Sequence, residues 1–214
     1  MSSCSPIQID QLPYQVQFHA LPSGGGLILK EKNFSVYAFE LNHRVPTWGF
    51  VFRENQRPPN IIKEKIVQLG LGVEHIKILK SGQSIVVNGR EIKPEDVTLP
   101  PPKQRSYAYV SDTKFFPDIV PWIRAVDVLY HEATFDNAHE QKAAETFHST
   151  AEQAAQIALM AEVGKLVIGH YSATIQDLEQ LLAEAKAVFP STELAFDGKM
   201  IDLPFVSSRK SVDS

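Results

Sequence analysis

Several side chains of the kind that bind metal ions or transfer protons stand directly after apolar, β-branched stretches of this sequence. His43 follows "FSVYAFELN", Asp112 follows "YAYVS", His131 and Glu132 follow "VDVLY", and His170 follows "KLVIG". In open α/β sheets ligands collect outside the carboxyl ends of the strands, because loops from several strands converge there. One shared site is therefore the hypothesis. An ordinary ion pair between His131 and Glu132 is the alternative at that position.

His148 is a further candidate, because it stands just before a predicted helix. Ser149, with Glu152 three residues later, forms a capping-box pattern ahead of "AEQAAQIALMAEV". The amino end of a helix favours anions and disfavours imidazolium. His148 is therefore placed to face a phosphate or an oxyanion.

Neutral imidazole suits zinc and a carboxylate can bridge two metals, so His43, Asp112 and His170 make a plausible ligand set without cysteine. Taken singly, a histidine after a strand is more often hydrogen-bonded than metal-bound, and an Asp before Thr is often a turn residue. Their recurrence at successive strand ends is what favours a site, and Asp197, after "ELAF", stands at a fifth such strand end. The remaining histidines lack this context and are expected at the surface: His19, His75 and His139.

Short turns separate the early strand candidates, as in an antiparallel meander, whereas the later ones alternate with helices. This order predicts an α/β (α+β) architecture with a mixed sheet. The predicted strands are 14–21, 26–31, 34–41, 48–54, 84–89, 106–112, 127–133, 165–170 and 192–198. Helices are expected at 116–126, after Thr150, and at 173–189, and segment 56–82 reads as an amphipathic, mildly basic excursion from the sheet.

Length and composition predict one compact core. The chain has 214 residues, 43% of them apolar, and a net charge of −4, so contact with a polyanion would need a local basic patch. Cys4 is the single cysteine, which excludes an internal disulfide. No apolar run is long enough to span a bilayer, so a cytoplasmic protein with no membrane partner is expected. Residues 1–13 and 207–214 are expected to be disordered.

Five motifs in this order resemble the C-terminal two-thirds of the ribonuclease Z family, the tRNA 3′-processing endoribonucleases of the metallo-β-lactamase superfamily. They are "LNHRVPTWGF", "YVSDTK", "HEATF", "HSTAEQAA" and "GHYS". The resemblance implies a metallo-β-lactamase-like αββα sandwich over residues 14–206, incomplete at its N-terminal half, with a protruding arm at about 56–82. It also implies precursor tRNA as substrate, two zinc ions as cofactors and a homodimer.

The same resemblance assigns roles to individual residues. His43 is expected to bind one zinc, Asp112 to bridge both and His170 to bind the other. His148 would contact the scissile phosphate and assist departure of the leaving oxygen, and Glu132 would orient His148 by a hydrogen bond.

The family's His-x-His-x-Asp-His motif does not occur in these 214 residues. Each metal would then keep only two protein ligands, whereas zinc generally needs three or four. The chain alone is therefore expected to bind zinc weakly or not at all and not to cleave precursor tRNA. An apolar sheet face is also expected to be bare, so that it pairs with a second copy or belongs to a longer protein, unless the remaining half differs from the sandwich. The alternatives are another phosphodiesterase of the superfamily, or a non-catalytic truncated copy that binds RNA or serves as a dimerisation partner.

Overall fold

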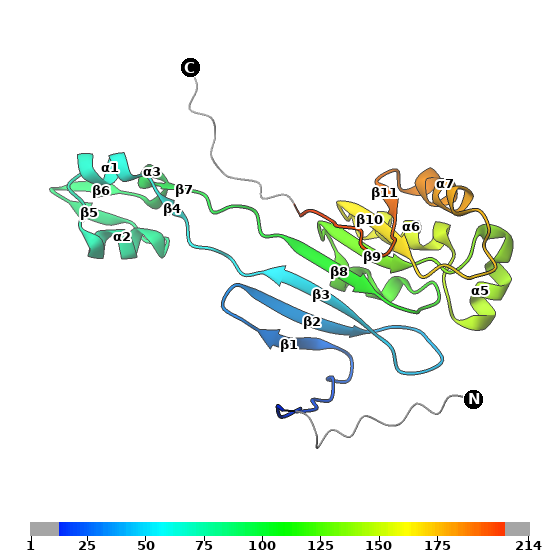
Figure 1. Ribbon diagram of the computed structural model, residues 1–214. Helices are drawn as coiled ribbons and strands as arrows, with labels where there is room; N and C mark the ends of the chain where they lie inside the picture. The colour runs from blue at the N-terminus through cyan, green and yellow to red at the C-terminus, as the bar shows by residue number, and fades with distance from the viewer. Residues whose placement is uncertain (1–12, 204–214) are drawn as a thin grey trace.

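A seven-stranded mixed sheet forms the centre of the molecule. The computed structural model describes residues 13–203, and the segments expected to be disordered lie outside this range apart from Pro13. The strands, in spatial order, are β1 (Gly26–Lys30), β2 (Phe34–Glu40), β3 (Trp48–Glu54), β8 (Ser106–Val110), β9 (Val128–Glu132), β10 (Lys165–Gly169) and β11 (Thr192–Leu194) (Figure 1). Within residues 13–203 no helix is long and apolar enough to cross a bilayer.

Strand direction decides which loops can meet. β1, β2, β3 and β8 pair antiparallel in turn, whereas β8, β9, β10 and β11 are parallel. Since two antiparallel steps restore the original direction, β2 runs the same way as β8, β9 and β10. The carboxyl ends of these four strands therefore lie at one edge of the sheet.

Two long helices cover one face of the sheet. α6 (Ala151–Met160) packs against β9 and β10, and α7 (Leu178–Val188) packs against α6 and β11. The apolar residues of these helices join those of the strands in the main core, which includes Val51, Ala108, Leu129, Ala154 and Leu181. The shorter helical segments are η2 (Pro117–Ile119), α4 (Val120–Ile123), η3 (Asn137–His139) and α5 (Glu140–Thr146).

Eight of the nine predicted strands are present, and the ninth, 14–21, was wrong. Apolar and polar residues alternate in segment 14–20, but these residues are exposed and pair with none of the described strands. The capping box of α6 lies one residue later than predicted: Thr150 Oγ1 accepts from Gln153 N at 3.2 Å and Gln153 Oε1 accepts from Thr150 N at 3.1 Å. Ser149 Oγ instead donates to the Thr113 carbonyl at 2.7 Å. α7 also begins later than predicted, after an Asp177 cap.

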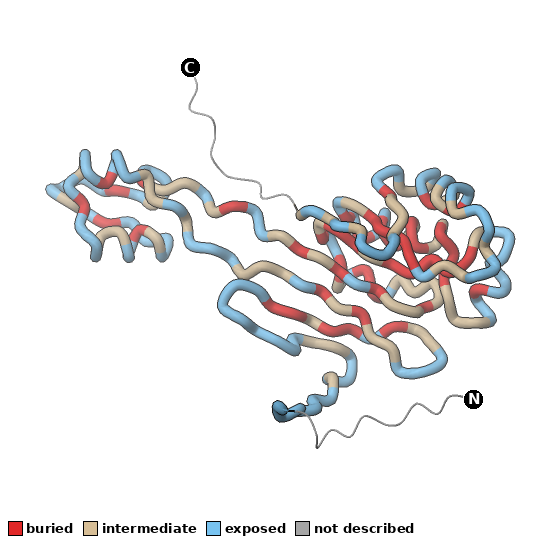
Figure 2. The backbone as a smooth tube through the Cα atoms, in the orientation of Figure 1, coloured by how far each residue is buried: buried red, intermediate tan, exposed pale blue. Residues whose placement is uncertain are grey.

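The other face of the sheet carries aromatic side chains. Tyr109 stacks on Tyr130 with ring centroids 5.0 Å apart, and Phe52 lies 6.1 Å from Tyr107. Phe52 is 40% exposed and Tyr109 38% exposed. Figure 2 shows buried residues interspersed with intermediate and exposed ones along the strands of the sheet. This agrees with the expectation of an apolar face that is not fully covered.

Between β3 and β8 the chain leaves the sheet and forms an arm, which we define as residues 55–104. It has its own small core, formed by Ile66, Leu71, Leu79, Ile85, Ile92 and Val97 and separate from the main core. Its elements are β4 (Asn60–Ile61), α1 (Lys63–Gln68), α2 (Val73–Lys80), β5 (Ile85–Val87), β6 (Arg90–Ile92), α3 (Pro94–Val97) and β7 (Thr98–Leu99). The segment 56–82 covers the first half of this unit, which projects from the body in Figure 1.

Leu79→Ala should destabilise the arm without loosening the main sheet. Leu79 is buried in the arm core, and a buried Leu→Ala change costs about 2–5 kcal/mol. Amide hydrogen exchange should accelerate across residues 60–99 and stay unchanged in β8, β9 and β10. Val67→Ala is the control, since Val67 is 81% exposed; equal acceleration in both regions would contradict two separate cores.

Candidate functional site

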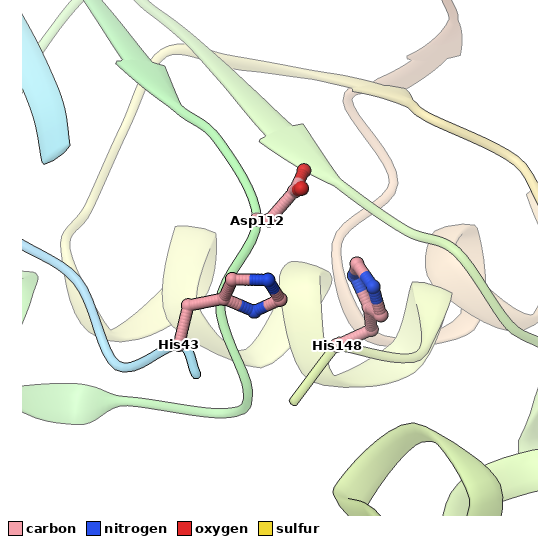
Figure 3. A group of neighbouring side chains, drawn as sticks. All are labelled: His43, Asp112 and His148. Atoms are coloured by element: carbon pink, nitrogen blue, oxygen red, sulfur yellow. The ribbon is translucent and has the colours of Figure 1, made fainter. Parts of the chain in front are cut away.

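Four of the residues predicted from the strand ends and the helix start lie together at the carboxyl edge of the sheet: His43, Asp112, His148 and His170. Ligand atoms of His43, Asp112 and His148 all lie within 4.8 Å of one another, and Figure 3 shows the three side chains directed at a common space. His170 joins them, with its Nε2 3.5 Å from Asp112 Oδ1. Four elements far apart in the sequence therefore contribute to one site.

Backbone contacts hold the loop after β2 beside the loop after β8. Asn42 N donates to Thr113 Oγ1 at 3.1 Å, and Lys114 N donates to the Asn42 carbonyl at 3.0 Å. These bonds keep His43 next to Asp112.

Glu132 is the buried centre of the site. Its Oε1 accepts from Thr113 N at 2.9 Å and from His148 Nδ1 at 2.8 Å. Its Oε2 accepts from the Thr134 backbone N at 3.1 Å and from Thr134 Oγ1 at 2.7 Å. The carboxylate is 0% exposed, so these four donors replace its lost hydration. The contact expected between Glu132 and His148 is present.

This network fixes the tautomer of each neutral imidazole. His148 donates from Nδ1 to Glu132. The Thr134 hydroxyl donates its hydrogen bond to Glu132, so its oxygen accepts a hydrogen bond from His170 Nδ1 at 2.9 Å. His43 Nδ1 donates to the Phe147 carbonyl at 2.9 Å. In each neutral ring the Nε2 lone pair is therefore left free for a ligand.

The charges of Glu132 and His148 stabilise each other. Burial raises the pKa of Glu132, but hydrogen bonds from His148, Thr134 and Thr113 outweigh it and leave that pKa below its usual value. The hydrogen bond to Glu132 raises the pKa of His148, against burial and the nearby positive charge of Arg44. The pair therefore favours a protonated His148 beside an ionised carboxylate.

His131 and Asp197 do not join the site. The Nδ1 of His131 lies 2.6 Å from the Glu132 backbone carbonyl rather than its carboxylate, so the ion-pair alternative was wrong. Its side chain is buried with Nε2 unpartnered among the described residues, and burial lowers its pKa. Asp197 is exposed, and it is not a member of the groups of described residues that could hold a metal ion. His19 and His139 are exposed as expected, and His75 is half-buried, its Nδ1 accepting from Gly72 N at 3.2 Å in the cap of α2.

Sequence reasoning missed two residues that orient the imidazoles. Thr134 connects Glu132 to His170, and its place two residues after Glu132 was the available signal. Phe147 ends α5 with a positive φ of 61°, which directs its carbonyl to His43, and the sequence carries no sign of this.

The donor set fits a divalent cation. Imidazole nitrogens and a carboxylate are the ligands that zinc takes when cysteine is absent, and each imidazole is already anchored through its other nitrogen. Two groups of the described residues could hold a metal ion: His43 with Asp112 and His148, and Glu132 with His148 and His170.

Comparison with known proteins finds similar sequences. No family model matches the chain. The ribonuclease Z of Parabacteroides distasonis is 41% identical over 194 residues, which cover 90% of this chain and 64% of the relative. That of Bacteroides thetaiotaomicron is 41% identical over 204 residues, covering 94% and 65%. This chain is similar to ribonuclease Z over about nine tenths of its own length. It spans just under two thirds of the length of these ribonuclease Z sequences.

Solved structures show the fold. The metallo-β-lactamase fold protein YhfI from Bacillus subtilis superposes with a TM-score of 0.55 at 17% identity, over 90% of this chain and 59% of that one. The short form of human tRNase Z superposes with a TM-score of 0.51 at 22% identity, over 86% of this chain and 49% of that one. The chain therefore has the metallo-β-lactamase fold, as the ribonuclease Z resemblance implied.

Glu132→Gln should lower the pKa of His148. The amide keeps the shape of the side chain and removes the charge that favours imidazolium. In the native protein, protonation of His148 contributes stability that is present below the unfolded pKa of about 6.5 and is lost as the pH rises through the raised folded pKa. In Glu132→Gln this contribution, and its loss at higher pH, should be smaller. Histidine ring NMR titration measures the shift. Glu140→Gln, an exposed carboxylate on α5, is the control, and an unchanged His148 titration in Glu132→Gln would contradict the pairing.

Proposed function

We propose that this chain forms part of a zinc-dependent endoribonuclease that removes the 3′ trailer of precursor tRNA. The observation that carries the proposal is the Glu132 network, which aims the Nε2 atoms of His148 and His170 at the space beside Asp112. The ribonuclease Z relatives support the same chemistry.

His43, Asp112 and His170 would hold the metal, with Asp112 placed between the two histidines to bridge two ions. A bound zinc pair supplies Lewis acidity, acidifying water and stabilising charge on phosphoryl oxygens. Because His-x-His-x-Asp-His is absent from the 214 residues, the proposal includes weak zinc binding and no precursor cleavage by this chain alone.

His148 would act on the leaving group. Its raised pKa favours the protonated ring, and Glu132 holds the ring through Nδ1, which leaves Nε2–H free to donate. Donation of that proton to the departing oxygen gives a 3′-hydroxyl on the tRNA body. Glu132 stays ionised and does not itself transfer the proton.

The arm would contact the RNA away from the chemistry. Residues 55–104 carry eight basic and five acidic side chains, whereas the rest of the chain carries thirteen basic and twenty acidic ones. The arm is thus locally positive in a negative protein, which is the sign required to approach phosphates. Arg53, in β3 just before the arm, donates to the Trp122 carbonyl of the body at 3.1 Å and is not counted with the arm.

A homodimer in the cytoplasm belongs to the same proposal. The partly exposed aromatic face of the sheet supports an additional packing partner.

The absent motif is the observation that favours the second candidate, a non-catalytic copy that binds RNA or serves as a dimerisation partner. Another phosphodiesterase of the superfamily would keep the metal site and lose tRNA binding.

Zinc titration followed by histidine NMR tests the metal site. The ring resonances of His43 and His170 should change their chemical shifts only at high zinc concentration, and those of His75 should not change. Asp112→Asn should weaken this response by more than about tenfold, since it removes the shared ligand. Asp118→Asn, an exposed carboxylate, is the control. Tight binding of two zinc ions, or turnover of precursor tRNA by the isolated chain, would refute an incomplete site; a response unaffected by Asp112→Asn would refute the site itself.

Lys63→Gln combined with Lys65→Gln should weaken binding of precursor tRNA. Both lysines are exposed on α1, and the slope of log affinity against log salt should become shallower by about one for each phosphate that the arm no longer neutralises. Fluorescence anisotropy at several salt concentrations gives that slope. The double variant Lys142→Gln, Lys186→Gln changes two exposed lysines of the body, and an equal loss of affinity there would assign the binding to net charge rather than to the arm.

A further inference from the structure

The arm leaves the sheet at the edge opposite the site. β3 ends at Glu54 and β8 begins at Ser106, and both ends lie at the amino edge of the parallel strands (Figure 1). The five residues of β8, about 17 Å at the usual rise per residue, separate this root from the loop that carries Asp112. A small turn at the root would therefore move the far end of the arm a long way relative to the site.

Packing between the arm and the body does not account for the direction of the arm. The apolar residues of the arm form a cluster of their own, separate from the main core. Two extended stalks, 55–59 and 100–105, connect the units. The contacts at the root must then hold the direction.

One ion pair joins the end of β3 to the returning stalk at that point. Arg105 Nη2 donates to Glu54 Oε1 at 2.6 Å, and the Arg105 backbone N donates to Glu54 Oε2 at 2.9 Å. The Glu54 backbone N donates to the Arg105 carbonyl at 2.9 Å. Both oxygens of one carboxylate are thus engaged by a single residue of the returning stalk, a geometry that fixes direction as well as distance.

Neighbouring bonds extend this contact. Gln104 Nε2 donates to the Glu54 carbonyl at 2.7 Å, and Arg57 Nη2 lies 3.5 Å from Glu54 Oε1. Asn55 donates to the Glu31 carbonyl at 2.7 Å and so ties the outgoing stalk to the turn between β1 and β2. The hydrogen bond from Arg105 lowers the pKa of Glu54 to about 2, so the carboxylate stays charged across the working pH range.

We propose that Glu54 and Arg105 are positioning residues that fix the direction of the arm, and with it the span from an RNA bound by the arm to the site at the carboxyl edge. The role in RNA presentation rests on the proposed function. The orientation of the arm is a property of the chain itself and can be measured without RNA or metal.

Double electron–electron resonance between spin labels on the arm and on the body tests the inference. The label sites are Val86→Cys on β5, 71% exposed, and Leu159→Cys on α6, 55% exposed, in a Cys4→Ser background. The unaltered root should give one narrow distance distribution. Glu54→Ala should widen it by roughly twofold, because stalks released at their root turn as a hinge.

Glu74→Ala is the matched control, because it removes another Glu-to-cation pair, Glu74 with Lys77 at 2.8 Å, within the arm and away from the root. Circular dichroism confirms that each variant is folded. If Glu54→Ala does not fold, Glu54→Gln, which keeps the shape and loses the charge, should give an intermediate width. A distribution in the folded Glu54 variant equal to that of Glu74→Ala would overturn the inference and leave the proposed nuclease function untouched.

Discussion

A single buried carboxylate organises the candidate site. Glu132 is removed from water, so its charge is tolerable only while its donors stay in place. Two of those donors, His148 and Thr134, are themselves parts of the site or orient it, and Thr134 passes the constraint on to His170. The need to solvate one charge therefore fixes ring orientations on two different loops. Preorganisation of this kind reduces the rearrangement that ligand binding would otherwise require.

Sheet topology brings the remaining ligands to the same place. The antiparallel meander at the start of the chain returns β2 to the direction of the parallel strands, which brings the loop carrying His43 to the same end of the sheet as the loop carrying Asp112. An odd number of antiparallel steps would have carried His43 to the far edge. The mixed sheet is thus a requirement of the site as well as a way to build a core.

Much of this arrangement could be predicted from the sequence, because strand ends and side-chain types are local properties. The runs that end at His43, Asp112, Glu132 and His170 are strands, and their ends meet. The failures have physical causes. Segment 14–21 has a strand-like alternation without a partner, and pairing is not encoded locally. Ser149 and Thr150 are both able to cap a helix, and the Ser149 hydroxyl is already used in a hydrogen bond to the Thr113 carbonyl, which leaves the cap to Thr150.

The arm also bears on how the chain folds. Pairing β3 with β8 brings Arg53 opposite Ser106 and so closes a long loop, at an entropic cost that grows with the logarithm of loop length. Within that loop, Ile61 pairs with Thr98, so the two stalks are already joined at the end where they enter the compact core of the arm. An arm that condenses early leaves only two short tethers to close. The insertion can therefore speed the formation of the sheet that it interrupts, by lowering the effective contact order of its central strand pair.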